Sequence, residues 1–254
     1  HKDEEIATIR DEAELHRRAT HSLEHGEALM RLGQTFIHYQ DYDQALEIYD
    51  QCQKLWNKIG ASQQEVKVRS NRANIYLRKG LKEEAVAQYH QSLKLVTEDS
   101  EDHAHLLYNL GLAQSQLRQN ELALGTLEEA LVKARTQHNS GLMCRIYNAR
   151  GAIFDDYDDP DNLERALQQY RLAEEYFSAH DDLTLLAGLK DHMAITFRKL
   201  GRLEEALAYS KQACDLLVSE KHDDHRAIAY LNRASLLIEF DDYKEAQLFA
   251  QKAS

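Results

Sequence analysis

A small residue recurs along this chain at intervals of about 40 residues, and this recurrence limits the folds that are open to it. In the segment NRANIYLRKGLKEEAVAQY (Asn71–Tyr89) the small residue is Ala73, and a second one, Ala85, follows twelve residues later. Small residues let two helices cross closely, so a regular spacing of them predicts helix crossings at a fixed period. The first small position, here named the anchor, is occupied by Gly33, Ala73, Gly111, Gly151, Ala194 and Ala234.

Three further positions keep the same period. The second alanine lies twelve residues after the anchor in every unit except the fourth, where the insertion FDDYDDPDNLERA delays it to fifteen; it is Ala45, Ala85, Ala123, Ala166, Ala206 and Ala246. Mostly bulky residues follow three places after the anchor, and large ones follow four places after most of the second alanines. We expect the bulky side chains to fill the space beside each crossing. Six such units predict a solenoid of stacked helix pairs.

The composition supports a helical chain. It contains one proline and ten glycines among 254 residues, which is few for a protein of sheets and long loops. The net charge of −12 argues against direct nucleic-acid binding, which needs a basic footprint. No run of about 18 apolar residues is present, so we expect no membrane span and a cytoplasmic protein.

The repeat pattern resembles that of the tetratricopeptide repeat (TPR) family. The segments LGQTFIHYQDYDQALEIY (residues 32–49) and MAITFRKLGRLEEALAYS (residues 193–210) carry the resemblance most specifically. The usual TPR period is about 34 residues, and the longer period here is similar to that of kinesin light chains, G-protein-signalling modulators and bacterial peptide-sensing regulators. HEAT and armadillo arrays also repeat near 40 residues, but the paired alanines twelve apart favour TPR. The resemblance implies an all-α, right-handed superhelical solenoid of six TPR-like helix-turn-helix repeats with an extra N-terminal helix.

The period also predicts the domain organisation. Residues 1–26 match the pattern poorly and are expected to form a capping helix or a partial repeat. The six repeats are expected at residues 27–64, 65–102, 103–142, 143–182, 183–223 and 224–254. The chain opens at His1 rather than Met, and no polar terminal cap follows Ala253, so we expect the array to continue beyond this sequence.

In TPR proteins the first helix of each repeat lines a groove that holds partner peptides, and the resemblance implies the same here. The groove-facing places lie six, three and two residues before the anchor and one, four and five after it. The peptide-binding candidates at these places are Lys67, Asn71, Asn74, Arg78, His105, Asn109, Arg145, Asn148, His192 and Asn232. Further polar residues at the same places are Ser70, Tyr108, Gln116, Asp155, Asp156, Asp191, Arg198, Lys199 and Ser235.

Asparagine stands two places before the anchor three times, as Asn71, Asn109 and Asn232. Because an amide both donates and accepts hydrogen bonds, such a ladder can hold the backbone of an extended peptide whatever its side chains. The alternative is that asparagine is merely tolerated on an exposed helix face.

A related clamp grips C-terminal carboxylates in TPR co-chaperones. Asn74, Asn109 and Arg145 stand at three of the five clamp places. Ser70 and Ala149 replace the other two residues, which are basic in the clamp, so this sequence matches it only in part.

Metal binding and redox chemistry have weaker support. The histidine pairs His21/His25 and His103/His105 and the motif HDDH (residues 222–225) each lack an evident third ligand, which a zinc site usually needs. The acidic insertion DDYDDPDN (residues 155–162) lacks the glycine of a calcium loop. For this segment we predict a capping box formed by Asp161 and Glu164 after Pro160, and an interaction loop is a further reading. Three widely spaced cysteines, Cys52, Cys144 and Cys214, are expected to be buried and reduced.

No catalytic motif is present: the chain has no glycine-rich phosphate loop and no GxSxG. The sequence therefore predicts a non-enzymatic protein- or peptide-binding scaffold without cofactor or metal. Its partner would be an extended segment that carries some acidic side chains. The alternative is a sensory TPR segment of a larger transcriptional regulator or signalling enzyme. Homo-oligomerisation is compatible with either function.

Overall fold

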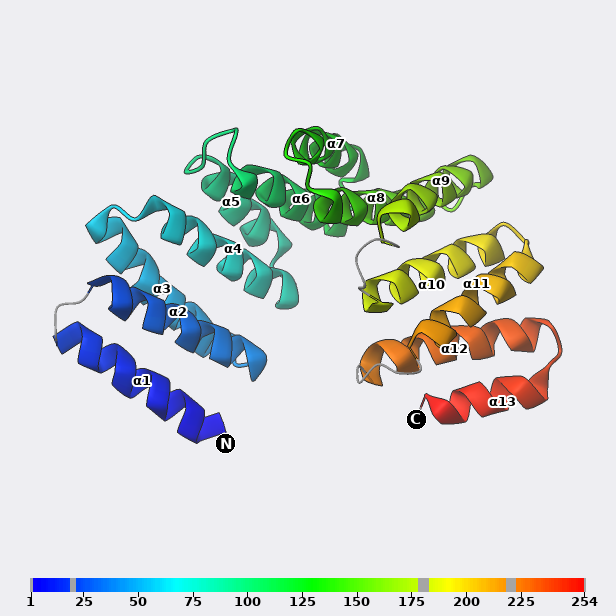
Figure 1. The fold of residues 1–254 in the computed structure, drawn as a ribbon, viewed down its shortest axis with the longest axis horizontal. Coiled ribbons are helices and arrows are strands. Elements are labelled where there is room, and N and C mark those ends of the chain that lie inside the picture. The colour runs from blue at the N-terminus through cyan, green and yellow to red at the C-terminus, as the bar shows by residue number, and fades with distance from the viewer. Residues whose placement is uncertain (1, 19–21, 178–182, 218–222, 254) are drawn as a thin grey trace. The chain divides into compact units, whose positions relative to one another are not determined.

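The computed structural model describes residues 2–18, 22–177, 183–217 and 223–253, and this part of the chain is all-helical, as predicted (Figure 1). The chain opens with α1 (Lys2–Arg18). The first helices of the successive pairs are α2 (Ser22–His38), α4 (Ser62–Arg78), α6 (Glu101–Gln116), α8 (Ser140–Asp155), α10 (Leu183–Lys199) and α12 (Asp223–Glu239). The second helices are α3 (Tyr42–Ile59), α5 (Lys82–Leu93), α7 (Asn120–Thr136), α9 (Pro160–Phe177), α11 (Leu203–Leu216) and α13 (Tyr243–Lys252).

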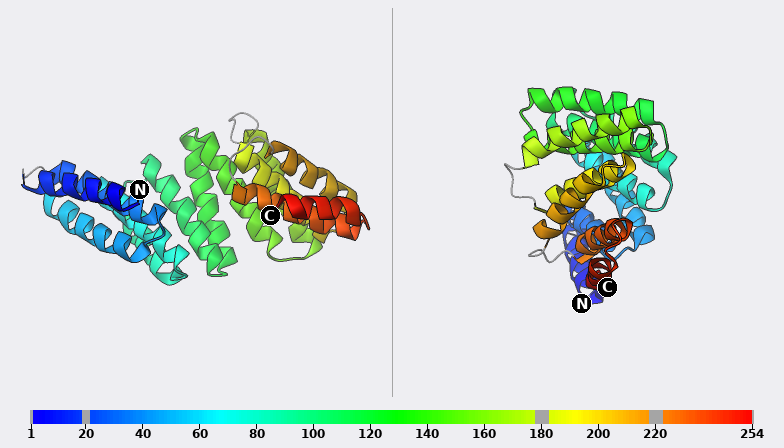
Figure 2. Two further views of the ribbon diagram at one scale, coloured as in Figure 1. Left: turned by 90° about the horizontal axis from the view of Figure 1, so that it is seen from below. Right: turned by 90° about the vertical axis from the view of Figure 1, so that its right-hand side faces the viewer.

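The helices form two compact units, residues 1–130 and residues 131–254, and α7 begins in the first unit and ends in the second. In the first unit α1 to α6 pack in chain order, each against the next. In the second unit α8 to α13 do the same, and there the first helix α10 also contacts the first helices α8 and α12 (Figures 1 and 2).

Each helix crossing is built on the small positions that define the repeat. Five of the six second alanines are fully buried, and Ala246 is 4% exposed. The anchor glycines lie under a large side chain of the second helix, so that an added Cβ atom would approach the side chain within 3.0 Å; the pairs are Gly33 with Tyr49, Gly111 with Leu127, and Gly151 with Tyr170. The predicted role of the small residues at crossings is therefore confirmed.

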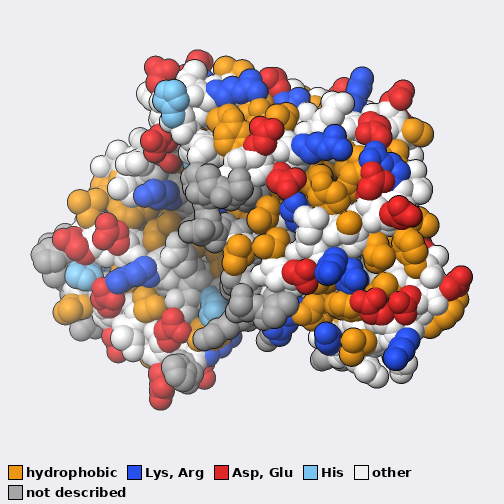
Figure 3. Space-filling model, turned by 45° about the vertical axis from the view of Figure 1, so that its right-hand side comes forward, with side chains coloured by type: hydrophobic (Ala, Val, Ile, Leu, Met, Phe, Trp, Pro, Cys, Tyr) orange, Lys and Arg blue, Asp and Glu red, His pale blue; other side chains and the backbone are white. Residues whose placement is uncertain are grey.

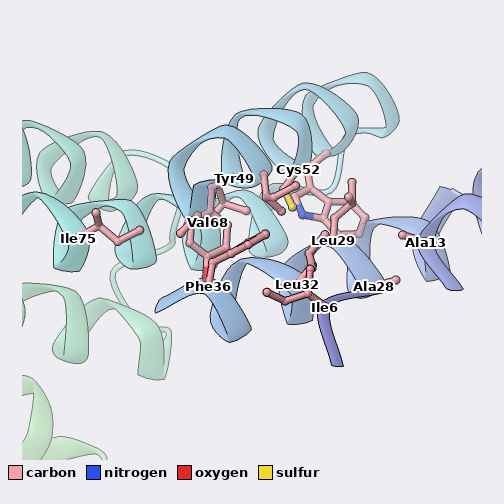
Figure 4. Packing of buried hydrophobic residues seen from close by; sticks show 13 residues of the cluster. Ile6, Ala13, Ala28, Leu29, Leu32, Phe36, Tyr49, Cys52, Val68 and Ile75 are labelled. Atoms are coloured by element: carbon pink, nitrogen blue, oxygen red, sulfur yellow. The ribbon is translucent and has the colours of Figure 1, made fainter. Parts of the chain in front are cut away.

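The core of the first unit shows how the bulky positions fill the remaining space. Leu29, Leu32 and Phe36 of α2 lie toward Tyr49 and Cys52 of α3 (Figure 4). α1 joins the same cluster through Ile6 and Ala13, and α4 joins it through Val68 and Ile75. Each helix thus buries its apolar side chains between its neighbours, and this continuous burial stabilises the stack.

One backbone conformation joins the two helices of every pair. The residue seven places after the anchor has a positive φ between 56° and 78° in all six pairs; it is Gln40, Gly80, Arg118, Asp158, Gly201 and Asp241. In five pairs the next residue donates its N–H to the carbonyl of the residue three places after the anchor, for example Leu81 to Tyr76 at 2.8 Å. This is the hydrogen bond of a Schellman helix end, which needs one left-handed residue.

The insertion in the fourth unit corrects two predictions. Its turn keeps the standard length, because Asp158 is the left-handed residue and α9 starts at Pro160. The three extra residues lengthen the start of α9, so the insertion does not form the additional loop that was predicted. The predicted capping box is also wrong: Asp159, not Asp161, caps α9 and accepts the N–H of Asn162 at 3.0 Å. Pro160 begins the helix as predicted, and its ring places the cap one residue before it.

Cys52, Cys144 and Cys214 are all buried and take part in no disulfide bond, as predicted. Burial raises the pKa of both Cys52 and Cys214 to about 12, so both thiols stay protonated and unreactive at neutral pH. None of the described helices has the length and apolar character needed to cross a membrane.

Candidate functional site

The first helices of the first unit enclose a hollow of about 220 Å³ on their shared face. Its lining comes from three successive first helices: Met30 and Gln34 of α2; Val66, Lys67, Ser70 and Asn71 of α4; and Asp102, His105, Leu106 and Asn109 of α6. We call this hollow the α2–α4–α6 hollow. Its floor is apolar, since Val66 and Leu106 are each only 3% exposed, and its rim carries amides, one cation and one carboxylate.

Four of the predicted peptide-binding residues meet at the α2–α4–α6 hollow: Lys67, Asn71, His105 and Asn109. Two others on α4 do not line it. Asn74 accepts the Tyr89 hydroxyl at 2.7 Å, which ties it to α5, and Arg78 is exposed at the end of α4.

Sequence reasoning missed the contribution of α2. Met30 stands three places before the anchor Gly33, and Gln34 stands one place after it. Both are groove-facing places of a TPR repeat. Applying that rule to the first repeat as well as to the later ones would have found both residues. The missed Val66, Leu106 and Asp102 stand outside those places, and only the packing of the helices brings them to the hollow.

The rim of the α2–α4–α6 hollow is suited to neutral hydrogen bonding. Asn109 makes no side-chain hydrogen bond within the described residues, so its amide can both donate to and accept from a ligand. Asn71 lies beside the buried Tyr49 hydroxyl: burial raises the pKa of Tyr49, and Asn71 partly offsets this rise. Lys67 is exposed and supplies a positive charge at the same rim.

In the second unit the predicted residues bond mainly to one another. His192 Nδ1 of α10 lies 3.1 Å from Asn148 Oδ1 of α8, and Asn232 of α12 donates its amide N–H to Asp191 of α10. Asn148, His192 and Asn232 are thus engaged in contacts between successive first helices. The hollow between α10 and α12 is correspondingly small, about 80 Å³.

Two ion pairs connect the same first helices, α8 with α10 and α10 with α12, further along their length. Lys199 of α10 pairs with Asp155 of α8 at 2.5 Å, and Arg198 of α10 pairs with Glu239 of α12 at 3.7 Å.

Arg145, the remaining predicted residue, is exposed on α8. Asn74 and Arg145, which match two places of the co-chaperone carboxylate clamp, belong to different units. Asn74 also accepts a hydrogen bond from the Tyr89 hydroxyl.

The Asp191 carboxyl is the most perturbed acid of this face. It is 7% exposed, and burial raises its pKa from 3.8 to about 6, against a smaller opposing effect of the Asn232 hydrogen bond. Burial also lowers the pKa of the neighbouring His192. Both shifts follow from desolvation of the charged form.

Charged side chains elsewhere are mixed in sign. Figure 3 shows acidic and basic side chains interspersed with apolar ones on the face that it draws, with no large area of one sign. Such a surface does not by itself point to nucleic acid or to an anionic membrane.

Several of the candidate metal ligands make other contacts within the fold. The acidic segment is tied into the fold, since Asp155 accepts the Thr196 hydroxyl at 2.6 Å and Asp159 caps α9. His25 Nδ1 lies 2.8 Å from the Ala13 carbonyl oxygen. His21 and His222 lie outside the described residues, and the described residues contain no group of three or more possible metal ligands.

Zinc, calcium or a chelator is expected to leave the melting temperature unchanged. A ligand that binds only the folded state must raise this temperature, and no described cluster offers the ligands that either ion prefers. Thermal unfolding followed by circular dichroism, with each ion at about 100-fold excess over protein, measures the effect. A reproducible rise of several degrees would contradict this prediction and would direct attention to His21 or to the HDDH motif.

The family model described as "Tetratricopeptide repeat" matches residues 24–98 and 185–254, which together are more than half of the chain. Comparison with curated protein sequences gave no match.

Similar solved structures share the fold at low sequence identity. The apo form of the quorum sensor NprR from B. thuringiensis is 18% identical with a TM-score of 0.69, over 91% of this chain and 64% of that chain. The apo form of RapI is 14% identical with a TM-score of 0.70, over 98% of this chain and 96% of that chain. NprR in complex with its cognate peptide NprX is 19% identical with a TM-score of 0.63, over 87% and 63%. The chain thus spans slightly less than two thirds of the length of NprR.

Proposed function

Because the chain belongs to the tetratricopeptide repeat family, we propose that it is a non-enzymatic module that binds an extended peptide segment at the α2–α4–α6 hollow. The rigid stack of helices presents the hollow ready-formed, and a preformed site lowers the entropy cost of binding. No chemical step is assigned to the protein.

The observation that carries this proposal is the meeting of Asn71, Asn109, Lys67 and His105 over an apolar floor formed by three first helices. Amides at two neighbouring helices can accept and donate to the backbone of an extended peptide, while the floor receives one of its side chains. A hollow of about 220 Å³ has room for one large side chain rather than for a whole small-molecule cofactor. Lys67 favours a peptide with an acidic side chain nearby.

The similar structures add support of a general kind. NprR is described with its cognate peptide NprX, which shows that a related fold binds a peptide. Identities of 14% to 19% support only a shared fold, so the support for peptide binding by this chain comes from the residues of the hollow.

The double variant Asn71→Ala/Asn109→Ala is expected to weaken peptide binding about five- to a hundred-fold, because it removes hydrogen bonds that each contribute about 0.5–1.5 kcal/mol. Peptides are first selected on the wild-type protein from a phage-displayed library of random segments. Fluorescence anisotropy then measures the affinity of the best peptide for each variant. Lys67→Glu is expected to add a loss that shrinks as salt is raised.

The control is Gln51→Ala/Gln63→Ala, which removes two exposed amides from α3 and α4 outside the hollow. This control is expected to bind the selected peptide like the wild type. Equal affinity of the asparagine double variant and the wild type, with both folded by circular dichroism, would rule out the hollow as the site.

A second candidate function is that of a sensory segment within a larger regulator. It is favoured by the likeness to NprR, described as a quorum sensor, of which this chain spans 64%. A sensor must change conformation on binding, whereas a scaffold need not. Small-angle X-ray scattering with and without the selected peptide separates them: a change in radius of gyration supports a sensor, and an unchanged radius supports a scaffold.

A further inference from the structure

The small hollow between α10 and α12, in the second unit, has a carboxylate in its wall. Its lining residues are Asp191, Ala194, Ile195 and Arg198 of α10 and Asn232 and Leu236 of α12, and we call it the α10–α12 hollow. Its volume of about 80 Å³ equals that of roughly two or three water molecules. The hollow therefore admits a group of a few heavy atoms and is too small for a nucleotide or a cofactor.

The carboxylate of Asp191 is only partly satisfied by the fold. Its side chain is 7% exposed. Asp191 Oδ2 accepts an N–H of Asn232, whereas Oδ1 is buried and has no hydrogen-bond donor among the residues that the structure describes. A buried carboxylate oxygen without a donor costs free energy and is uncommon in native proteins. Asp191 thus offers one strong acceptor to a group that enters the hollow.

A second carboxylate, Asp155 of α8, shows how the same array satisfies a carboxylate completely. Asp155 Oδ1 accepts the Thr196 hydroxyl at 2.6 Å, and Oδ2 pairs with the Lys199 ammonium at 2.5 Å. Both oxygens have a donor, and one of the donors is a cation. The step from α10 to α12 supplies Asp191 with one neutral amide alone.

The cations near Asp191 on α10 are paired with other acids. Lys190 pairs with Glu174 of α9, and Arg198 pairs with Glu239 of α12 at 3.7 Å. Burial is accordingly the main cause of the raised pKa of Asp191, and the opposing effect comes from the Asn232 amide. A positive group that reached the hollow would satisfy both the charge and the second oxygen of this carboxylate.

We propose that the α10–α12 hollow binds a primary alkylammonium group, the group that ends a lysine side chain, with Asp191 Oδ1 as its charged acceptor. Asn232 supplies a second acceptor, because its N–H is donated to Asp191 and its carbonyl oxygen remains. Ala194 and Leu236 form an apolar wall for the methylene groups. A guanidinium fits less well, since it bonds both oxygens of a carboxylate and Oδ2 is already used.

The character of the hollow separates this ligand from others. One carboxylate and one amide are fewer ligands than zinc or calcium takes. Because Asp191 Oδ1 is shielded from water, its attraction to an ammonium is stronger than that of a surface carboxylate. The site shares no residue with the α2–α4–α6 hollow, so this proposal does not rest on the function proposed above.

NMR titration of the ¹⁵N-labelled whole chain with n-butylammonium chloride tests the proposal at pH 7, where the Asp191 carboxyl, with a pKa of about 6, is mostly ionised. The wild type is expected to show saturable shifts of the Asn232 side-chain amide and of the Ala194 and Ile195 backbone N–H groups. The expected dissociation constant is about 1–10 mM, which lies within the limit for a ligand of about five heavy atoms.

Two further ligands separate charge from hydrogen bonding. Tetramethylammonium chloride has the same charge but no N–H donor, and butanol has no charge, so neither is expected to give saturable shifts at these positions. A GGKGG peptide with blocked ends distinguishes the sources of the group. Binding at least as tight as that of n-butylammonium supports a lysine side chain of a polypeptide, and weaker binding supports a free amine.

Asp191→Asn is expected to weaken n-butylammonium binding at least about 10-fold, because a neutral acceptor replaces a charged one. The matched control Glu204→Gln removes an exposed carboxylate from α11 in the same unit, and it is expected to bind like the wild type. The Asn71→Ala/Asn109→Ala variant is also expected to bind like the wild type, which separates this site from the α2–α4–α6 hollow.

Three results would overturn the proposal. A wild type without saturable shifts would show that the α10–α12 hollow takes water only. Equal affinity of the wild type and a folded Asp191→Asn variant would show that the carboxylate is not the acceptor. Equally tight binding of tetramethylammonium would show that no N–H donor is recognised.

Discussion

Replacing Gly151 by alanine is expected to lower the free energy of unfolding by about 1–3 kcal/mol, although alanine is the better helix former. Gly151 is an anchor in the middle of α8, and an added Cβ would lie within 3.0 Å of three atoms of the Tyr170 ring. The ring is 1% exposed and has little room to move, so α8 and α9 must separate or the ring must leave its position. Urea unfolding followed by circular dichroism measures the change.

The control for this substitution lies in the same unit. Gly188 is also inside a first helix, α10, but an added Cβ there would have no neighbour within 4 Å. Gly188→Ala is therefore expected to raise the free energy of unfolding by about 0.5–1 kcal/mol, the ordinary gain of alanine over glycine in a helix. If the two substitutions shifted stability in the same direction, the anchor would not be a point of close helix crossing.

Asp191→Asn is expected to make the protein more stable at pH 7 by up to about 3 kcal/mol and to leave its stability at pH 4 almost unchanged. Burial raises the pKa of Asp191 from 3.8 to about 6, so the folded state holds this proton more tightly than the unfolded state does. The contribution of Asp191 is therefore fully present below about pH 4 and is lost as the pH rises towards 6. Asparagine does not titrate, and its carbonyl can still accept the Asn232 amide.

The measurement is the difference between variant and wild type in unfolding free energy at several pH values from 4 to 7. Taking the difference cancels other titrating groups, including His192, whose lowered pKa changes stability in the opposite direction. Asp191→Ala is a useful comparison, since it also removes the charge but leaves Asn232 without its acceptor. A difference between the asparagine variant and the wild type that stays constant from pH 4 to pH 7 would show that Asp191 is ionised in the folded protein throughout this range.

The helical fold and the positions of the helix crossings are readable from the amino-acid sequence. A close helix crossing requires a small residue at one particular position of each repeat. Such positions are therefore visible in the sequence, as Ala85, Ala206 and the other small residues show. The resemblance to TPR repeats implies which face of each first helix lines the groove, and helical periodicity gives the residues that point to that face. Lys67, Asn71, His105 and Asn109 are therefore assigned to one surface by the sequence and its resemblance to TPR repeats.

Tertiary packing sets which of those residues contact a neighbouring helix and which line a hollow. Asn71 and Asn232 stand at the same place of their repeats, yet Asn71 borders the α2–α4–α6 hollow whereas Asn232 donates to Asp191. It also decided that the acidic insertion lengthens α9 from the Asp159 cap onward. The physical reason is that periodicity fixes directions within one helix, whereas a side-chain contact depends on the offset between two helices, and that offset is set by all the side chains packed between them.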